Sequence, residues 1–352
     1  MTKANAGIAQ DTLPFKPSWI DRVNDWIEKL PLPPWLFYSL VGTALILLQM
    51  LFLWLDGGLK TISLLPVIAY NAMALPYAVA FVHLLDSQAI AALHSMIPAL
   101  ALDRGEYEDL EYRLSTMPPW RSFFVGLFLV CLLIITELGG VEPARYAALD
   151  TLPRFTVVYQ VLDKLSAVAA GVLVYHTIRQ LRLVNSIYAR HARINLFDLR
   201  PIYAFSKLTA TTAVGLLIPE YGWMLINPEL MRNPLGLGGT LAFTILSVAV
   251  FALPLLGAHR LMEHKKQRML HQLDLGFEAV FARFNKSFGD GDFAAVDRLN
   301  GTIASLETQY RRISSIPTWP WRHETARFVM SVIATPLILT IVQFLIGRLF
   351  GG

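Results

Sequence analysis

The chain alternates between long apolar stretches and shorter polar segments. An α-helix that rises about 1.5 Å per residue needs roughly 20 apolar residues to cross a hydrocarbon core about 30 Å thick. Seven stretches approach that length, and their pattern predicts an all-α polytopic membrane protein. The expected spans are Trp35–Leu55, Ile62–Leu85, Ser122–Val141, Phe155–Tyr175, Ala204–Ile226, Gly238–Ala258 and Thr325–Phe350.

The composition agrees with a membrane protein, since 55% of the 352 residues are hydrophobic and 16% are charged. The fifth stretch is the weakest, because Lys207 and Glu220 bracket a short apolar run that Pro219 interrupts. Without this span the basic segment 259–324 would be exported, against the positive-inside rule. We therefore expect the fifth stretch to span.

The positions of Lys and Arg predict the orientation. Most lie before the first span or in the segments 86–121, 176–203 and 259–324. The opposite side has only Lys60, Arg145, Arg154, Arg232 and Arg348. The positive-inside rule then predicts a plasma (inner) membrane protein with a cytoplasmic N-terminus and an external C-terminus.

This topology divides the chain into four parts. They are a cytosolic tail with an interfacial amphipathic helix (1–34), six spans with cytosolic inserts at 86–121 and 176–203 (35–258), a cytosolic helical hairpin (259–324), and a seventh span with a short external end (325–352). The apolar side of the N-terminal amphipathic helix is expected to consist of Trp19, Ile20, Val23, Trp26 and Ile27.

A short motif recurs where the chain enters a span from the inner face. It consists of a helical segment, a proline and an aromatic residue, and we expect the aromatic rings to lie at headgroup depth. The expected interface anchors are Trp35, Trp120, Tyr203, Trp319 and Trp321. The nearly equal spacing of the first three favours an internal repeat, and convergence of unrelated span entries is the alternative.

The segment from about His259 to Ile316 has the three-four spacing of an antiparallel helix pair. Its two expected seams are Met269, Leu273, Phe277, Val280, Phe284 and Phe288, and Val296, Leu299, Ile303, Leu306, Tyr310 and Ile313. Asp292, after Gly291, is an expected N-cap. The pair is either a self-contained hairpin or a coiled coil through which 259–316 binds a cytosolic protein or a second copy.

Polar groups inside spans are costly and are therefore candidates for function. The candidate intramembrane polar site consists of Asn71, Glu137, Asp163, Lys164 and Glu220. These residues either line an outward-facing polar cavity or pair between helices and orient the bundle. Because neighbouring residues on a helix point about 100° apart, we expect Asp163 and Lys164 to have different partners.

All eight histidines fall on the expected inner side, where we interpret them as solvated at the interface; a proton-sensing role is the alternative. No catalytic, cofactor or metal motif is recognisable in the sequence, and Cys131 is the single cysteine. The net charge of +4 comes from the inner-face loops, so no nucleic acid is expected as a partner.

The sequence thus favours a non-enzymatic membrane scaffold or sensor with a cytosolic helical hairpin as its interaction module. The alternative is a channel or transporter that uses the intramembrane polar residues. An intramembrane enzyme is a third hypothesis. The lipid bilayer is the one partner common to all three.

Overall fold

A computed structural model describes residues 14–58, 64–138, 149, 151–193, 195–227, 234–334 and 338. Throughout these residues the chain is helical and contains no β-strand, apart from an isolated bridge between Leu100 and Ala192. The all-α class predicted from the sequence is therefore confirmed for the described part of the chain.

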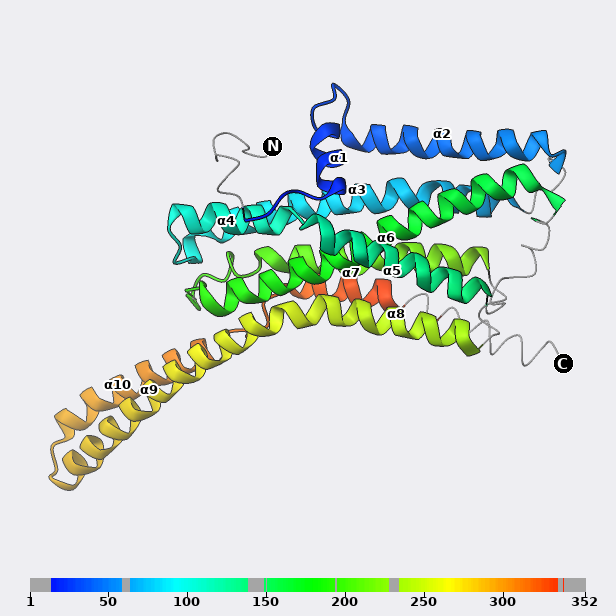
Figure 1. The fold of residues 1–352 in the computed structure, drawn as a ribbon. Coiled ribbons are helices and arrows are strands. Elements are labelled where there is room, and N and C mark those ends of the chain that lie inside the picture. Colours follow the sequence, from blue (N-terminus) through cyan, green and yellow to red (C-terminus); the bar gives the residue numbers. More distant parts are fainter. Residues whose placement is uncertain are drawn as a thin grey trace, which may run out of the picture.

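Six long helices run side by side and form the body of the molecule (Figure 1). They are α2 (Pro34–Leu55), α3 (Leu65–Met96), α5 (Pro119–Leu138), α6 (Pro153–Arg190), α7 (Ala204–Ile226) and α8 (Pro234–Ala252). Proline opens several of them, for example Pro34 of α2 and Pro153 of α6. Proline suits the first turn because its fixed φ is helical and its missing N–H has no partner there.

Among the described residues, five helical stretches are long and apolar enough to cross a membrane. They are Pro34–Leu55, Leu65–Ala99, Arg104–Ile135, Pro153–Arg190 and Thr244–Gly289. The fifth expected span forms a helix with the predicted bounds, α7, but it is not one of the five. Residues 323–334 begin the seventh expected span, and most of that span lies outside the described residues. Five membrane-length helices are therefore established, and seven spans stay a prediction.

Two of the expected cytosolic inserts begin within long helices and not at helix ends. The helix α3 continues past the predicted boundary at Leu85 to Met96, and α6 continues past Tyr175 to Arg190. The segments 86–121 and 176–203 therefore begin as continuations of the spanning helices, because no glycine or proline interrupts either helix at the predicted boundary. Between α3 and α5 lies the short helix α4 (Arg104–Ser115).

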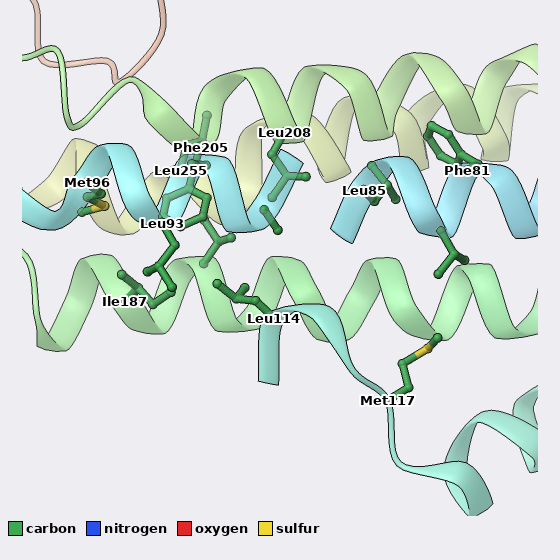
Figure 2. Close-up of a cluster of buried hydrophobic side chains, with 14 of the residues drawn as sticks. Phe81, Leu85, Leu93, Met96, Leu114, Met117, Ile187, Phe205, Leu208 and Leu255 are labelled. Carbon is green, nitrogen blue, oxygen red and sulfur yellow. The ribbon is translucent and has the colours of Figure 1, made fainter. Parts of the chain in front are cut away.

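A hydrophobic core joins the ends of these helices. Leu93 of α3, Ile187 of α6, Phe205 of α7 and Leu255 meet in one cluster of fully buried side chains (Figure 2). The same cluster includes Leu114 at the end of α4 and residues of the N-terminal helix α1 (Trp19–Ile27). This end of the bundle is therefore covered by protein.

The helices α5 and α6 approach each other closely at two glycines. A Cβ atom added to Gly171 would lie 2.8 Å from the Cα atom of Gly126 and 2.8 Å from the carbonyl oxygen of Val125. Small residues at such a crossing allow two backbones to come into contact, which is a common way for helices to associate in a membrane.

The helices α9 (Leu256–Gly289) and α10 (Phe293–Ser314) pack against each other and extend beyond the end of the bundle (Figure 1). Gly291 turns the chain between them with a φ of 73°, a conformation that favours glycine. The side chain of Asp292 accepts a hydrogen bond from the Ala295 N–H at 2.9 Å, so its predicted N-cap role is confirmed. We call this pair the α9–α10 hairpin.

Candidate functional site

Three of the five candidate intramembrane residues meet between α5 and α6. The ammonium of Lys164 donates to the carboxylate of Glu137 on α5, and its Nζ lies 3.2 Å from Oδ2 of Asp163. It also donates to Oε1 of Gln160 at 2.9 Å. We call Glu137, Asp163 and Lys164 the ion-pair cluster.

The expectation that Asp163 and Lys164 have different partners is wrong. The flexible four-carbon stem of lysine lets its ammonium reach back to the neighbouring carboxylate as well as across to α5. The three side chains are 25% (Lys164), 24% (Glu137) and 27% (Asp163) exposed, so none is sealed inside the bundle. Their arrangement braces α5 against α6.

The other two candidate residues lie on a different helix pair. Asn71 on α3 is buried, and its side-chain oxygen has no hydrogen-bond partner among the described residues. Glu220 lies on α7 directly after Pro219. The carbonyl of Pro219 accepts a hydrogen bond from the Tyr70 hydroxyl of α3 at 3.2 Å. The five predicted residues thus fall into an α5–α6 group and an α3–α7 group.

The expected interface anchors also divide into two kinds. Trp35 and Trp120 are exposed, as a ring in contact with lipid would be. Trp319 and Trp321 stack on each other with ring centroids 4.4 Å apart, and Trp319 stacks on His259 at 4.0 Å. Tyr203, which precedes α7, is half-buried. The last two tryptophans therefore fasten the base of the α9–α10 hairpin to the bundle.

A second group of polar residues, which the sequence interpretation missed, lies buried at the end of the bundle covered by α1 and α4. Asp86 of α3 and His176 of α6 are 1% and 0% exposed, and His176 Nε2 lies 3.1 Å from Asp86 Oδ1. Neither side chain has a partner in hydrogen-bonding geometry within the described chain. A buried polar group without a hydrogen bond is costly, so the pair is unusual.

The N-terminal helix contributes two more polar side chains to this group. Asp21 forms a capping box with Ser18, and its Oδ2 also accepts a hydrogen bond from the Met117 N–H at 2.9 Å. Asn24 accepts a hydrogen bond from the Tyr38 hydroxyl at 3.0 Å. Both residues of α1 are 1% exposed. The burial of the Asp21 carboxyl raises its pKa, and the nearby charge of Asp86 raises that pKa further.

Two side chains of α6 complete the group. The amide of Gln180 donates to the Leu114 carbonyl at 3.0 Å, and its own oxygen has no partner among the described residues. Arg179 donates to the carbonyls of Arg113 and Thr116 at 2.6 Å each, and its charge acts on Asp21 and Asp86. We call Asp21, Asn24, Asp86, His176 and Gln180 the buried polar cluster.

This cluster corrects two expectations. His176 is not solvated at the interface, and His83 is largely buried beside Glu28, with His83 Nε2 3.0 Å from the carboxylate oxygen. The expected apolar side of α1 is also incomplete, because Asp21 and Asn24 are buried with Ile20 and Ile27 while Trp26 is 54% exposed. The uninterrupted helical pattern after Leu85 and Tyr175 was the signal that could have revealed the buried pair.

The α9–α10 hairpin carries apolar side chains that the helix pair does not cover. Its expected seams are mostly half-buried, and the seam residues Phe288 and Tyr310 are exposed. Phe281, Phe288 and Phe293 are exposed near the turn, and the ring of Phe284 contacts those of Phe281 and Phe288. We call these four phenylalanines the aromatic tip.

The chain matches no protein-family model, no curated protein and no solved structure. Function is therefore inferred from the residues of the chain itself. Among the described residues no group of three or more His, Cys, Asp or Glu side chains could hold a metal ion.

Proposed function

We propose that this protein is a non-enzymatic membrane scaffold or sensor whose α9–α10 hairpin is its interaction module. In this proposal the chain crosses a plasma (inner) membrane seven times, with the hairpin in the cytoplasm and the C-terminus outside. The distribution of Lys and Arg along the sequence supports that orientation. The partner is a second copy of the same hairpin.

The observation that carries the proposal is the aromatic tip. Contiguous apolar patches are rare on soluble surfaces unless they bind a partner. Burial of one phenylalanine side chain is favourable by about 1.5–3 kcal/mol, and a ring left in water does not gain this free energy. Phe281, Phe288 and Phe293 are 51%, 62% and 70% exposed. In the sequence they flank the turn at Gly291, and this turn is the end of the hairpin farthest from the bundle (Figure 1). A two-helix pair cannot cover these rings by itself.

The small net charge of the hairpin is compatible with association with its own copy. Residues 256–314 include nine Lys or Arg residues and seven Asp or Glu residues, so the net charge is 9 − 7 = +2. Two copies would meet without strong repulsion, and an apolar patch is complementary to itself in an isologous contact. The coiled-coil pairing expected from the sequence belongs to this proposal.

The test measures self-association of the full-length protein in membranes. A cysteine at the exposed position Ala294, in a Cys131→Ser background, should form a cross-link between two copies. The double change Phe281→Ser and Phe288→Ser should abolish that cross-link. The matched control is Leu275→Ser, which removes an exposed apolar side chain of α9 that lies outside the aromatic tip and should leave cross-linking unchanged.

The transport alternative gives a different set of results. If the protein is a channel or transporter that uses the ion-pair cluster, Asp163→Asn should abolish flux in reconstituted vesicles without loss of folded protein. A protein that is monomeric with or without the aromatic tip, and whose flux depends on Asp163, would replace the scaffold proposal with the transport one.

A further inference from the structure

The buried polar cluster and the adjacent Arg179 together carry more negative than positive charge. Asp21 and Asp86 contribute two carboxylates, and Arg179 is the cation whose charge acts on both of them. With both carboxylates ionised and His176 neutral, the balance is 1 − 2 = −1. A buried charge without a counter-charge is strongly unfavourable, and one bound proton would remove the imbalance.

Other ionisable groups lie around the cluster. Those that face it from the neighbouring helices are Glu28 of α1, Tyr38 of α2, His83 of α3, Tyr112 and Arg113 of α4, and Tyr175 and Arg179 of α6. Glu28 pairs with His83 at 3.0 Å, and Arg113 pairs with Asp109 at 2.8 Å. Neither pair supplies a free positive charge to Asp21 or Asp86.

The unpartnered atoms are located where a proton could bind. Both ring nitrogens of His176, both carboxylate oxygens of Asp86 and Oδ1 of Asp21 have no hydrogen-bond partner within the described chain. The ring of His176 and the carboxylate of Asp86 are 3.1 Å apart, so a protonated imidazolium there would face its counter-ion directly. Imidazole is the side chain that ordinarily gains a proton just below neutral pH.

We propose that the buried polar cluster is a proton-binding site that latches α1 onto the bundle. With one proton shared among Asp21, Asp86 and His176 the site is neutral and α1 stays docked. When the proton leaves, one uncompensated negative charge remains, and α1 relieves it by moving Asp21 into water. The hydrogen bond from Met117 to Asp21 and the packing of Ile20 and Ile27 are lost with that movement.

Stabilising contacts of α1 give the latch its structural basis. Asp21 is the one carboxylate of the site that belongs to α1, and the Phe15 carbonyl just before this helix accepts a hydrogen bond from the Tyr112 hydroxyl at 2.6 Å. The hydrogen bond between Tyr38 and Asn24 holds the middle of the helix. This inference does not depend on the hairpin and stands or falls separately from the proposed function.

The test is hydrogen–deuterium exchange of the full-length protein in lipid nanodiscs, from about pH 5 to about pH 8. After correction for the intrinsic exchange rate, amides 19–27 of the wild type should be protected at low pH. As the pH is raised, the exchange rate of these amides should increase by up to about tenfold per pH unit, which is the limit when opening releases one proton. Asp86→Asn removes one carboxylate, so α1 should stay protected across the range.

Two further variants keep the result decisive. His176→Gln removes the imidazole that lies 3.1 Å from Asp86, one of the three groups that share the proton, and should move the midpoint to lower pH. Glu28→Gln is the matched control, because it changes the pair with His83, which reaches the cluster only through the Tyr38 hydroxyl and contains none of the groups that share the proton, so its profile should follow the wild type. A wild-type profile without pH dependence would overturn the proposal. So would a profile that Glu28→Gln flattens and Asp86→Asn leaves unchanged.

Discussion

The crossing of α5 and α6 predicts a large effect of a single methyl group. In the change Gly171→Ala, the new Cβ would lie 2.8 Å from the Cα atom of Gly126 and from the carbonyl oxygen of Val125, about 1 Å closer than carbon atoms normally pack. Both atoms belong to the backbone, so no side-chain rotation can relieve the overlap. Overpacking of this kind costs about 1–3 kcal/mol.

The measurement is the free energy of unfolding in detergent, followed by tryptophan fluorescence during denaturant titration. Gly222→Ala on α7 is the control, because its Cβ would be 3.4 Å from the nearest atom, an ordinary contact with the Tyr70 ring. That variant should keep the wild-type stability or gain up to about 1 kcal/mol from reduced freedom of the unfolded chain. Equal stability of Gly171→Ala and the wild type would refute the close approach of the two helices.

Further predictions concern the charged groups and the hairpin. Burial and the charge of Asp86 raise the pKa of Asp21 in the folded protein. Asp21 therefore contributes its full stability below its unfolded pKa of about 4, and this contribution is lost as the pH rises through its folded-state pKa. The melting temperature should therefore decline with rising pH in the wild type and much less in Asp21→Asn. Lys164→Met leaves its two carboxylate partners without a cation and should lower the unfolding free energy by about 1–3 kcal/mol, whereas Lys164→Arg should keep most of it. Leu306→Asp places a charge in the seam of α10, so limited proteolysis should cut the hairpin early while the bundle stays intact.

Much of the helical framework could be predicted because each span carries its own local signal. The first span was expected at Trp35–Leu55 and forms α2 from Pro34 to Leu55, and α7 has the bounds expected from the sequence. Apolar length, proline at the helix start and a polar turn at the end act within a few residues, so a single sequence reveals them. The packing of α9 on α10 was predicted from the three-four spacing of the two segments. Pairing among the longer helices of the bundle depends on side chains distant in the chain and was not predicted.

The candidate sites illustrate the same limit. Glu137, Asp163 and Lys164 were recognised as costly polar positions, yet only the crossing of α5 and α6 brings them together. Asp86 and His176 were missed because the spans were ended where hydropathy falls, whereas burial at that end comes from α1 and α4 packing over α3 and α6. When distant segments of the chain bury a residue, the hydropathy pattern around that residue does not reveal its burial.

In the proposed topology the hairpin and the C-terminus lie on opposite sides of the bilayer. A pair of topology reporters in the full-length chain, one inserted at Gly291 in the hairpin turn and one fused at Gly352, tests this arrangement. We expect the reporter at Gly291 to read cytoplasmic and the reporter at Gly352 to read external. Both reporters on the same side of the membrane would contradict it.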